Sequence, residues 1–408
     1  MGKQAPPRVI KVRLTGSTLQ QRLLHKLATT SPVYGRMAMQ RGRILIVGAG
    51  PSGLTAAIEL KRRGFTPRII DKNSRPHAQS RALAINPRTL QILQPSGVTN
   101  KLLHKGWRMN HVHFRGPSDE LLEVDLSDLD GPFNFMLALP QYETETVLER
   151  HLTELGVPVE RECELVKLEQ EDEVVTAVIQ TSSGDEEVFH PPMVIGADGA
   201  HSIVRSQIGL TFSGSSYPQD WGLADVELEP TLTMDGPTMF DRSPNIFGVI
   251  PFSATRARIV ADHSDPLETM PPILKVIKVN WKSSFRISHR LANLYQKGRI
   301  FLVGDAAHVH SPFGGRGMNL GIEDAAWLAW QVSTGRTHQY MLDRRPVAAE
   351  VLKTVDAGTR FLASNNTAIR LFRQRFLPVL GRTDYFQTRF MNIMSAENTP
   401  FPPWLEDE

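Results

Sequence analysis

Residues 43–53 read RILIVGAGPSG, an apolar segment that runs into a glycine-rich turn. A helical pattern follows to about Arg63, and a second apolar segment at residues 67–70 ends at Asp71, 18 residues after Gly53. In a strand–turn–helix–strand unit of this kind, the first glycine permits the tight turn, the second lets the backbone approach a pyrophosphate, and the third lets the helix pack on the strand. The carboxylate after the second strand can accept a hydrogen bond from a ribose hydroxyl. The stretch therefore predicts a Rossmann-like unit that binds a dinucleotide through Gly48, Gly50, Gly53 and Asp71.

Two later segments also consist of an apolar strand followed by glycine and aspartate. Residues 194–205 read VIGADGAHSIVR, and residues 299–319 read RIFLVGDAAHVHSPFGGRGMN. The apolar spacing from about Met318 to Val332 predicts a helix, so the glycines at 314–317 are expected to form a turn at its N-terminus. The chain contains a single GxGxxG, so only one dinucleotide has its own fingerprint.

The three segments resemble, in family order over about residues 43–360, the GxGxxG, DG and GD signatures of the group A flavoprotein monooxygenases. This is the family of para-hydroxybenzoate hydroxylase and phenol hydroxylase. The resemblance implies an enzyme with non-covalent FAD that uses NAD(P)H and O2 to hydroxylate a phenolic or polycyclic aromatic substrate through a flavin hydroperoxide. It implies a cofactor site made by Gly48, Gly50, Pro51, Ser52, Gly53, Asp71, Lys72, Arg81, Gln141, Asp198, Arg205, Gly304, Asp305, Pro312, Gly315, Gly317, Met318 and Asn319.

The resemblance also implies individual roles within this site. It places Arg81 near the pyrophosphate, Gln141 at the flavin, and Asp305 on the ribityl or pyrophosphate side of FAD. Asp198 and Arg205 belong to the segment that the family links to both FAD and NAD(P)H. Backbone N–H groups around Gly317 to Asn319, at the start of the expected helix, would stabilise the anionic edge of reduced flavin, because a helix N-terminus carries partial positive charge. Family members usually have Gln where this chain has Arg316, which bears on the electrostatics of that edge.

The pattern of the remaining chain predicts an α/β fold, with a single Rossmann-like FAD-binding domain interleaved with an antiparallel-sheet substrate domain and followed by C-terminal helices. Apolar and polar residues alternate at 221–228 and 245–252, as expected for antiparallel strands with one buried face. The expected parts are a leader at 1–42, the FAD-binding domain at 43–112, 141–212 and 299–335, the substrate domain at 113–140 and 213–298, and a helical region at 336–408.

Charge and composition exclude several other classes of protein. Residues 1–43 carry nine of the 46 basic residues and none of the 43 acidic ones, so the remaining chain has a formal net charge of −6. That sign argues against nucleic-acid binding. No apolar run is long enough to span a bilayer. The single cysteine, Cys163, excludes a redox-active cysteine pair within the chain. The basic leader is interpreted as a disordered segment, and the protein is then expected to be cytoplasmic. The alternative is that the leader is a targeting segment for an organelle.

Several points stay open at this level. No motif ranks the candidate bases on the substrate sheet, so no catalytic residue is assigned, and His308 and His310 are interpreted as packing or polar groups with no metal site.

The expected partners are a small aromatic substrate and O2, with a homodimer left open. Epoxidation, Baeyer–Villiger oxidation and a non-catalytic binding module on the same fold are the alternatives. Residues 369–394 are interpreted as packed helices with a solvated basic face, with a membrane-surface helix as the alternative. The unranked candidate bases and neighbours are Tyr217, Trp221, Asp225, Phe247 and His263.

Overall fold

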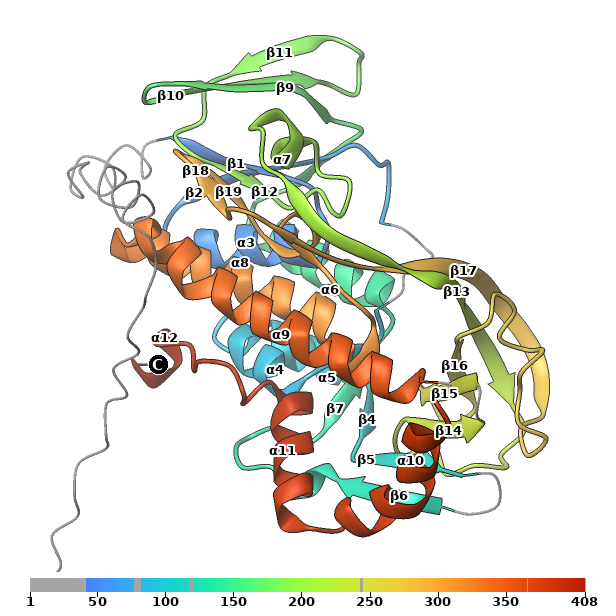
Figure 1. Cartoon of the computed structure of the whole chain (residues 1–408). Coiled ribbons are helices and arrows are strands. Elements are labelled where there is room, and N and C mark those ends of the chain that lie inside the picture. Colours follow the sequence, from blue (N-terminus) through green and yellow to red (C-terminus); the bar gives the residue numbers. More distant parts are fainter. Residues whose placement is uncertain (1–41, 77–81, 117–119, 243–244, 365, 408) are drawn as a thin grey trace, which may run out of the picture.

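The computed structural model describes residues 42–76, 82–116, 120–242, 245–364 and 366–407 (Figure 1). A small sheet, a larger central sheet and a layer of helices are stacked on one another, and a third sheet extends from their side (Figure 1). This is the α/β fold expected from the sequence. The predicted leader, apart from its last residue, and Arg81 lie outside the described residues.

The central sheet has six strands in the order β18-β19-β12-β1-β2-β8. All neighbouring strands of this sheet pair in parallel, except that β18 and β19 pair antiparallel. Val47 pairs with Ile70 and with Gly196, and Gly196 pairs with Leu302, so β1, β2, β12 and β19 end at the same edge. The three motif turns are therefore neighbours in space. The strands are β1 (Arg43–Val47), β2 (Thr66–Asp71), β8 (Val159–Arg161), β12 (Val194–Gly196), β18 (Gln296–Lys297) and β19 (Ile300–Leu302).

Helices cover one face of the central sheet, and the antiparallel sheet β11-β10-β9 covers the other (Figure 1). The apolar side chains of β1 are buried from Ile44 to Val47 because both faces are covered. The covering strands are β9 (Glu164–Glu171), β10 (Val174–Gln180) and β11 (Glu186–Phe189). The helices are α3 (Pro51–Arg62), α4 (Pro87–Leu93), α5 (Val98–Leu103), α6 (Gln141–Glu154), α8 (Arg316–Thr334) and α9 (Tyr340–Leu362).

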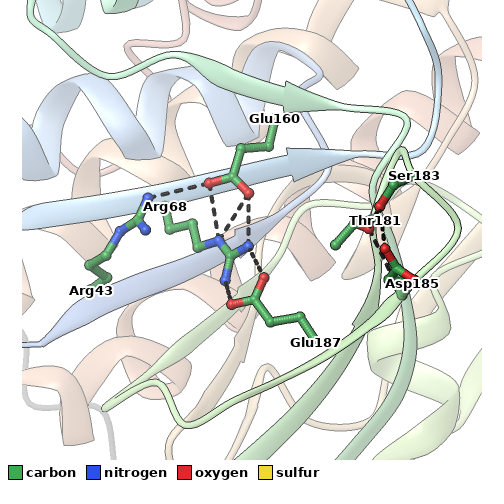
Figure 2. A network of polar contacts seen from close by, with 7 residues as sticks. All are labelled: Arg43, Arg68, Glu160, Thr181, Ser183, Asp185 and Glu187. Carbon is green, nitrogen blue, oxygen red and sulfur yellow. Dashed lines mark hydrogen bonds and ion pairs between the residues drawn. The ribbon is translucent and has the colours of Figure 1, made fainter.

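The buried Arg68 of β2 joins the two stacked sheets through ion pairs with two partly exposed carboxylates (Figure 2). Its guanidinium donates to Glu160 of β8 at 2.8 Å and to Glu187 of β11 at 2.6 Å. Arg43 donates to the same Glu160 at 3.3 Å. The hydrogen bonds that Arg68 donates to Glu187 and Glu160 raise its pKa, so the cation persists although the side chain is buried.

The third sheet has eight strands in the order β20-β17-β13-β16-β15-β14-β5-β6. Its neighbours are antiparallel except β14 and β5, which are parallel. One expectation needs correction, because Met136–Ala138 (β7) pairs with β3 and β4 and not with this sheet. All three residues of β7 are buried, which suits the middle strand of a small internal sheet. The strands are β3 (Ala84–Ile85), β4 (Trp107–Met109), β5 (His111–Arg115), β6 (Glu120–Asp125), β13 (Phe212–Leu228), β14 (Thr238–Arg242), β15 (Asn245–Pro251), β16 (Arg256–Ala261), β17 (Val276–Ala292) and β20 (His308–Val309).

The chain ends in helices, as expected after Gly335. These are α10 (Thr367–Leu380), α11 (Asp384–Ser395) and α12 (Trp404–Asp407). Trp404 packs against Trp327 of α8 with the ring centroids 5.5 Å apart, which holds the end of the described chain to the core. In the part of the chain that the structure describes, no helix combines the length and apolar character needed to cross a membrane.

Candidate active site

A cavity of about 820 Å³ is lined both by the motif turns of the central sheet and by the eight-stranded sheet. Many residues that the sequence placed at the cofactor line it, and others support the turns from behind. The lining set comprises Gly50, Pro51, Ser52, Gln141, Arg205, Asp305, Pro312, Gly315, Gly317 and Met318. The predicted residues outside the lining are Gly48, Gly53, Asp71, Lys72, Asp198, Gly304 and Asn319.

The three glycines of the first turn have different surroundings. Gly48 has a φ of +101°, and a Cβ there would lie 2.4 Å from the carbonyl oxygen of Ala197. A Cβ on Gly53 would lie 1.9 Å from the carbonyl oxygen of Gly48. A Cβ on Gly50 would meet no described atom within 4 Å, and Gly50 lines the cavity. Packing therefore explains Gly48 and Gly53, whereas Gly50 faces a space that fits the close approach of a pyrophosphate.

Asp71 supports the glycine turn from behind. Its Oδ2 accepts a hydrogen bond from the backbone N–H of Ala49 at 2.7 Å, and its Oδ1 accepts one from the N–H of Asn73 at 2.8 Å. The bond from Asp71 to a ribose stays a prediction. Lys72 is exposed, with its Nζ 3.9 Å from a carboxylate oxygen of Glu164.

The turn after β12 is fixed by Asp198 and Arg205. Asp198 accepts a hydrogen bond from the N–H of Val204 in α7 (Ile203–Gln207) through Oδ2, and its buried Oδ1 has no hydrogen-bond partner among the described residues. Burial raises the pKa of this carboxyl. The buried Arg205 donates to the carbonyls of Ala306 at 2.8 Å and Ala200 at 2.9 Å. Arg205 thus connects the turn after β12 to the turn after β19.

The turn after β19 packs directly on the first turn. A Cβ on Gly304, whose φ is +59°, would lie 2.3 Å from Oγ of Ser52. Asp305, the next residue, is exposed and lines the cavity. This arrangement places the Asp305 residue beside the space in front of Gly50 and suits contact with a dinucleotide.

The glycine loop at residues 314–315 leads directly into the N-terminus of α8 at the cavity. Gly314 and Gly315 have φ of +72° and +62°, and α8 begins at the next residue. Asn319 holds this loop, because its Nδ2 donates to the carbonyl of Ala84 at 2.9 Å and its Oδ1 accepts from the N–H of Asn86 at 3.0 Å. The first turn of α8 therefore opens on the cavity at Gly317 and Met318, where N–H groups that have no acceptor within the helix suit an anionic flavin edge.

Gln141 lies at the cavity with a buried acid behind it. Its Nε2 donates to Oε1 of Glu145 at 2.8 Å, one turn along α6. Burial raises the pKa of Glu145 to about 7, while the hydrogen bond from Gln141 opposes the shift. Glu145 therefore changes its charge near neutral pH.

The two histidines of the GD segment line the cavity, and His308 is buried whereas His310 is partly buried. Nε2 of His308 lies 2.7 Å from Oδ2 of Asp324, whose Oδ1 accepts a hydrogen bond from Arg344, also at 2.7 Å. Burial alone would raise the pKa of Asp324, but Arg344 and His308 hold it below its ordinary value. Burial lowers the pKa of His310 to about 3, and its Nδ1 lies 2.8 Å from the carbonyl oxygen of Ser311. Among the described residues, no group of three or more His, Cys, Asp or Glu side chains lies together as a metal site.

The opposite wall of the cavity is apolar. It comes from β4, β5, β14, β15 and α11, and consists largely of methionine, phenylalanine and aliphatic side chains. Sulfur and aromatic side chains adapt to flat aromatic ligands. Residues of this wall include Met109, Val112, Phe114, Met239, Ile250, Phe390 and Met394.

Of the five unranked candidates, Trp221 is the one that lines the cavity. Tyr217 donates a hydrogen bond to Asp356, Phe247 is a fully buried core residue, and His263 interacts with the backbone of Asp265. Asp225 forms a two-point ion pair with Arg258.

Sequence reasoning missed Arg258 and the contribution of helix α11 to the cavity. Arg258 is 2% exposed and lines the cavity. It donates to Asp225 at 2.7 and 2.9 Å and to the carbonyl of Ala82 at 3.3 Å, so it connects the substrate-side sheet to the FAD side. In α11, Phe390 and Met394 line the cavity. The spacing of Phe386, Phe390 and Met394 by four residues was the signal that could have identified this wall.

Residues 41–269 and 255–354 match the family described as "FAD binding domain". The 6-methylpretetramide 4-monooxygenase of Streptomyces rimosus is 35% identical over 356 residues, which cover 82% of this chain and 62% of that protein. The pentachlorophenol 4-monooxygenase of Sphingobium chlorophenolicum is 31% identical over 362 residues, which cover 81% of this chain and 66% of that protein. The chain thus spans less than two thirds of the length of either relative.

The solved structures with a similar fold include a p-nitrophenol 4-monooxygenase from Pseudomonas putida. Its TM-score is 0.79 at 22% identity, over 87% of this chain and 98% of that one. An anhydrotetracycline hydroxylase from Streptomyces rimosus has a TM-score of 0.71 at 25% identity, over 88% of this chain and 77% of that one.

Proposed function

This chain belongs to the group A flavoprotein monooxygenases, a family with an FAD-binding domain, and on this premise we propose that it hydroxylates an aromatic substrate with FAD, NAD(P)H and O2. The names of its relatives favour hydroxylation over epoxidation, Baeyer–Villiger oxidation or a non-catalytic role, because several are monooxygenases of phenols or polycyclic aromatics. The oxygen-transfer route expected from the resemblance, the nicotinamide preference and the oligomeric state stay predictions.

One observation carries the proposal: a single cavity of about 820 Å³ has the motif turns on one side and an apolar wall on the other. The open space at Gly50 would take the pyrophosphate of a dinucleotide, and the N-terminus of α8 would face its flavin end. The apolar wall fits a ring system placed against that flavin. FAD, when bound, would supply the hydride acceptance and the oxygen chemistry.

The residues of the chain would hold, orient and enclose the reactants. Gly50, Ser52 and Asp305 would hold the dinucleotide, and N–H groups at Gly317 and Met318 would stabilise the flavin edge. The wall of methionine and phenylalanine side chains would exclude water from the reacting atoms, which a reactive oxygen donor requires.

Purified protein tests this function directly. We expect a yellow protein that releases free FAD on denaturation and oxidises NADH or NADPH faster when an aromatic is added. The panel is p-nitrophenol, 2-naphthol and anhydrotetracycline under ¹⁸O2, and at least one product should carry one ¹⁸O atom. A colourless protein that FAD does not reconstitute would contradict the cofactor assignment. A yellow protein whose NAD(P)H oxidation no aromatic stimulates would contradict the substrate class.

A further inference from the structure

Arg316 joins the flavin-side loop to helix α11. It is the first residue of α8, and its side chain is 2% exposed. Its Nη1 donates hydrogen bonds to the carbonyl of Ile393 and, at 2.9 Å, to Oδ1 of Asn398. Ile393 lies in the last turn of α11, where carbonyl groups lack intrahelical partners and a cation is favourable. Arg316 is therefore a cap for α11 supplied by a distant part of the chain.

The capped helix forms part of the cavity wall. Phe390 of α11 packs edge-on against Phe114 of β5, with ring centroids 5.7 Å apart, and both line the cavity. Met394 lies directly after the capped carbonyl. A Cβ on Gly314 would lie 3.9 Å from the sulfur of Met394 and 3.7 Å from Cγ of Arg316. The flavin-side loop and the apolar wall thus meet at Met394.

The charge of Arg316 fits a connecting role better than a role at the flavin. Burial lowers its pKa to about 10, so the guanidinium is still a cation at neutral pH. The structure records no ion pair for it among the described residues. A cation at the N-terminus of its own helix is unfavourable, and the carbonyl end of α11 offsets this cost. Its known contacts, at Ile393 and Asn398, belong to α11 and the segment after it.

We propose that Arg316 is a positioning residue: it caps α11 and so fixes Phe390 and Met394 against the flavin-side loop, which sets the space available to an uncharged aromatic ring. The inference rests on the proposed function. The side chains of Phe390, Met394 and Phe114 carry no hydrogen-bond donor, so an anionic group placed directly against them would lose its hydration without gaining a donor there. Ring systems without a charge on that side are therefore the ligands that this wall selects.

Ligand binding to the FAD-loaded protein tests the proposal without turnover. The probe is 2-naphthol, and the readout is the perturbation of the flavin absorbance spectrum. Arg316→Met should weaken 2-naphthol binding at least fivefold while the Kd for FAD changes less than twofold. Arg316→Lys keeps a cation at the cap and should restore most of the affinity. Arg389→Met is the matched control, because Arg389 is an exposed arginine of α11, the helix that Arg316 caps, and this variant should bind like the parent.

A double-mutant cycle separates positioning from a general loss of stability. Phe390→Ala should also weaken binding, and the Arg316→Met/Phe390→Ala protein should be no weaker than the worse single variant, because Arg316 acts through the wall. Asn398→Ala removes one of the two acceptors of Arg316, and it replaces Arg316→Met as the test variant if Arg316→Met does not fold. It should weaken binding in the same direction by a smaller factor.

Different results would overturn the positioning role of Arg316 and the proposed aromatic hydroxylation. Additive losses in the cycle, or variants of Arg316 and Asn398 that bind 2-naphthol like the Arg389→Met control, would overturn the positioning role. A parent protein that holds FAD but shows no flavin perturbation with any aromatic of the panel would overturn the proposed function, and the inference would fall with it.

Discussion

Arg205 donates a hydrogen bond to the carbonyl of Ala306 over 2.8 Å, and this bond joins the turn after β12 to the turn after β19. The two turns come from segments about 100 residues apart in the chain. The guanidinium also lies 3.9 Å from the ring centroid of Phe212, which fixes its orientation. The cofactor side of the cavity is therefore a connected frame and does not consist of three independent loops.

Removing this connection should weaken both the fold and the cofactor site. Arg205→Met leaves the carbonyls of Ala306 and Ala200 without their donor, and a buried unsatisfied group costs about 1–3 kcal/mol. We expect a lower free energy of unfolding in urea and weaker FAD binding. Arg205→Lys, which keeps one donor, should lie between parent and Met variant. Unchanged stability and FAD affinity in Arg205→Met would show that the connection is dispensable.

We expect Glu145 to make a pH-dependent contribution to the free energy of unfolding. Its pKa in the folded protein is about 7, above the ordinary value of 4.5, mainly because of burial. A raised carboxyl pKa means that the folded state favours the protonated form, so the contribution is fully present below about pH 4.5 and is lost as the pH rises through 7. Glu145→Gln should therefore match the parent at pH 4.5 and be more stable by about 1–3 kcal/mol at pH 8.5. Thermal unfolding of the parent and of Glu145→Gln at the two pH values measures this difference in stability. The same difference at both pH values would contradict a raised pKa for Glu145.

Asp305 should contribute directly to FAD affinity. Its residue lines the cavity beside Ser52, and its replacement by Ala would leave a cofactor hydroxyl or its partner unpaired, at about 1–3 kcal/mol. The Kd for FAD should rise by about 5- to 150-fold, as measured by flavin fluorescence titration. Asp185→Ala, in the exposed turn between β10 and β11, is the control and should bind FAD like the parent. Parent-like affinity of Asp305→Ala would make Asp305 a structural residue only.

The buried pair of acids on α8 depends on Arg344. Its guanidinium donates to Glu323 at 2.6 Å and to Asp324 at 2.7 Å, and all three side chains are at most 3% exposed. Arg344→Met would leave two buried carboxylates without their cation, and such changes cost about 3–5 kcal/mol. Urea unfolding should show a loss of this size. Arg345→Met, at the next position, removes one hydrogen bond to the carbonyl of Ala292 and should cost much less.

The first turn could be predicted from the sequence because its determinants are local. Gly48 and Gly53 lie within one strand–turn–helix unit, and each is required by contacts with residues of its own turn or the adjoining one. The register of the parallel strands then brings the later motifs to the same edge. The predicted antiparallel sheet follows in the same way from the alternation of apolar and polar residues.

The contacts of the cavity wall could not be predicted, because they join distant residues. Arg316 reaches an acceptor 77 residues later, and no local pattern identifies that partner. The sequence drew attention to Arg316 at the flavin edge, whereas the recorded bonds of its guanidinium go to α11 and Asn398. In the same way, Met136–Ala138 looked like part of the large sheet, because a short buried strand does not specify its neighbours.

The most direct test of a dinucleotide at the first turn is the FAD affinity of Gly50→Thr. Gly50 has a φ of −76°, which any residue adopts, and a Cβ there meets no described atom within 4 Å. Threonine is about as good as glycine at a helix N-cap, so the protein without FAD should keep its stability. Gly64→Ala, at a φ of +83° and with equally open surroundings, is the control and should lose stability but not FAD affinity.

Titration of both variants with FAD, followed by flavin fluorescence, decides the question. If the space in front of Gly50 holds the pyrophosphate, the added side chain must collide with it. We expect a folded Gly50→Thr protein whose Kd for FAD is at least tenfold higher than that of the parent, which corresponds to about 1.4 kcal/mol. A folded Gly50→Thr protein that binds FAD as tightly as the parent would contradict the placement of the cofactor in this cavity.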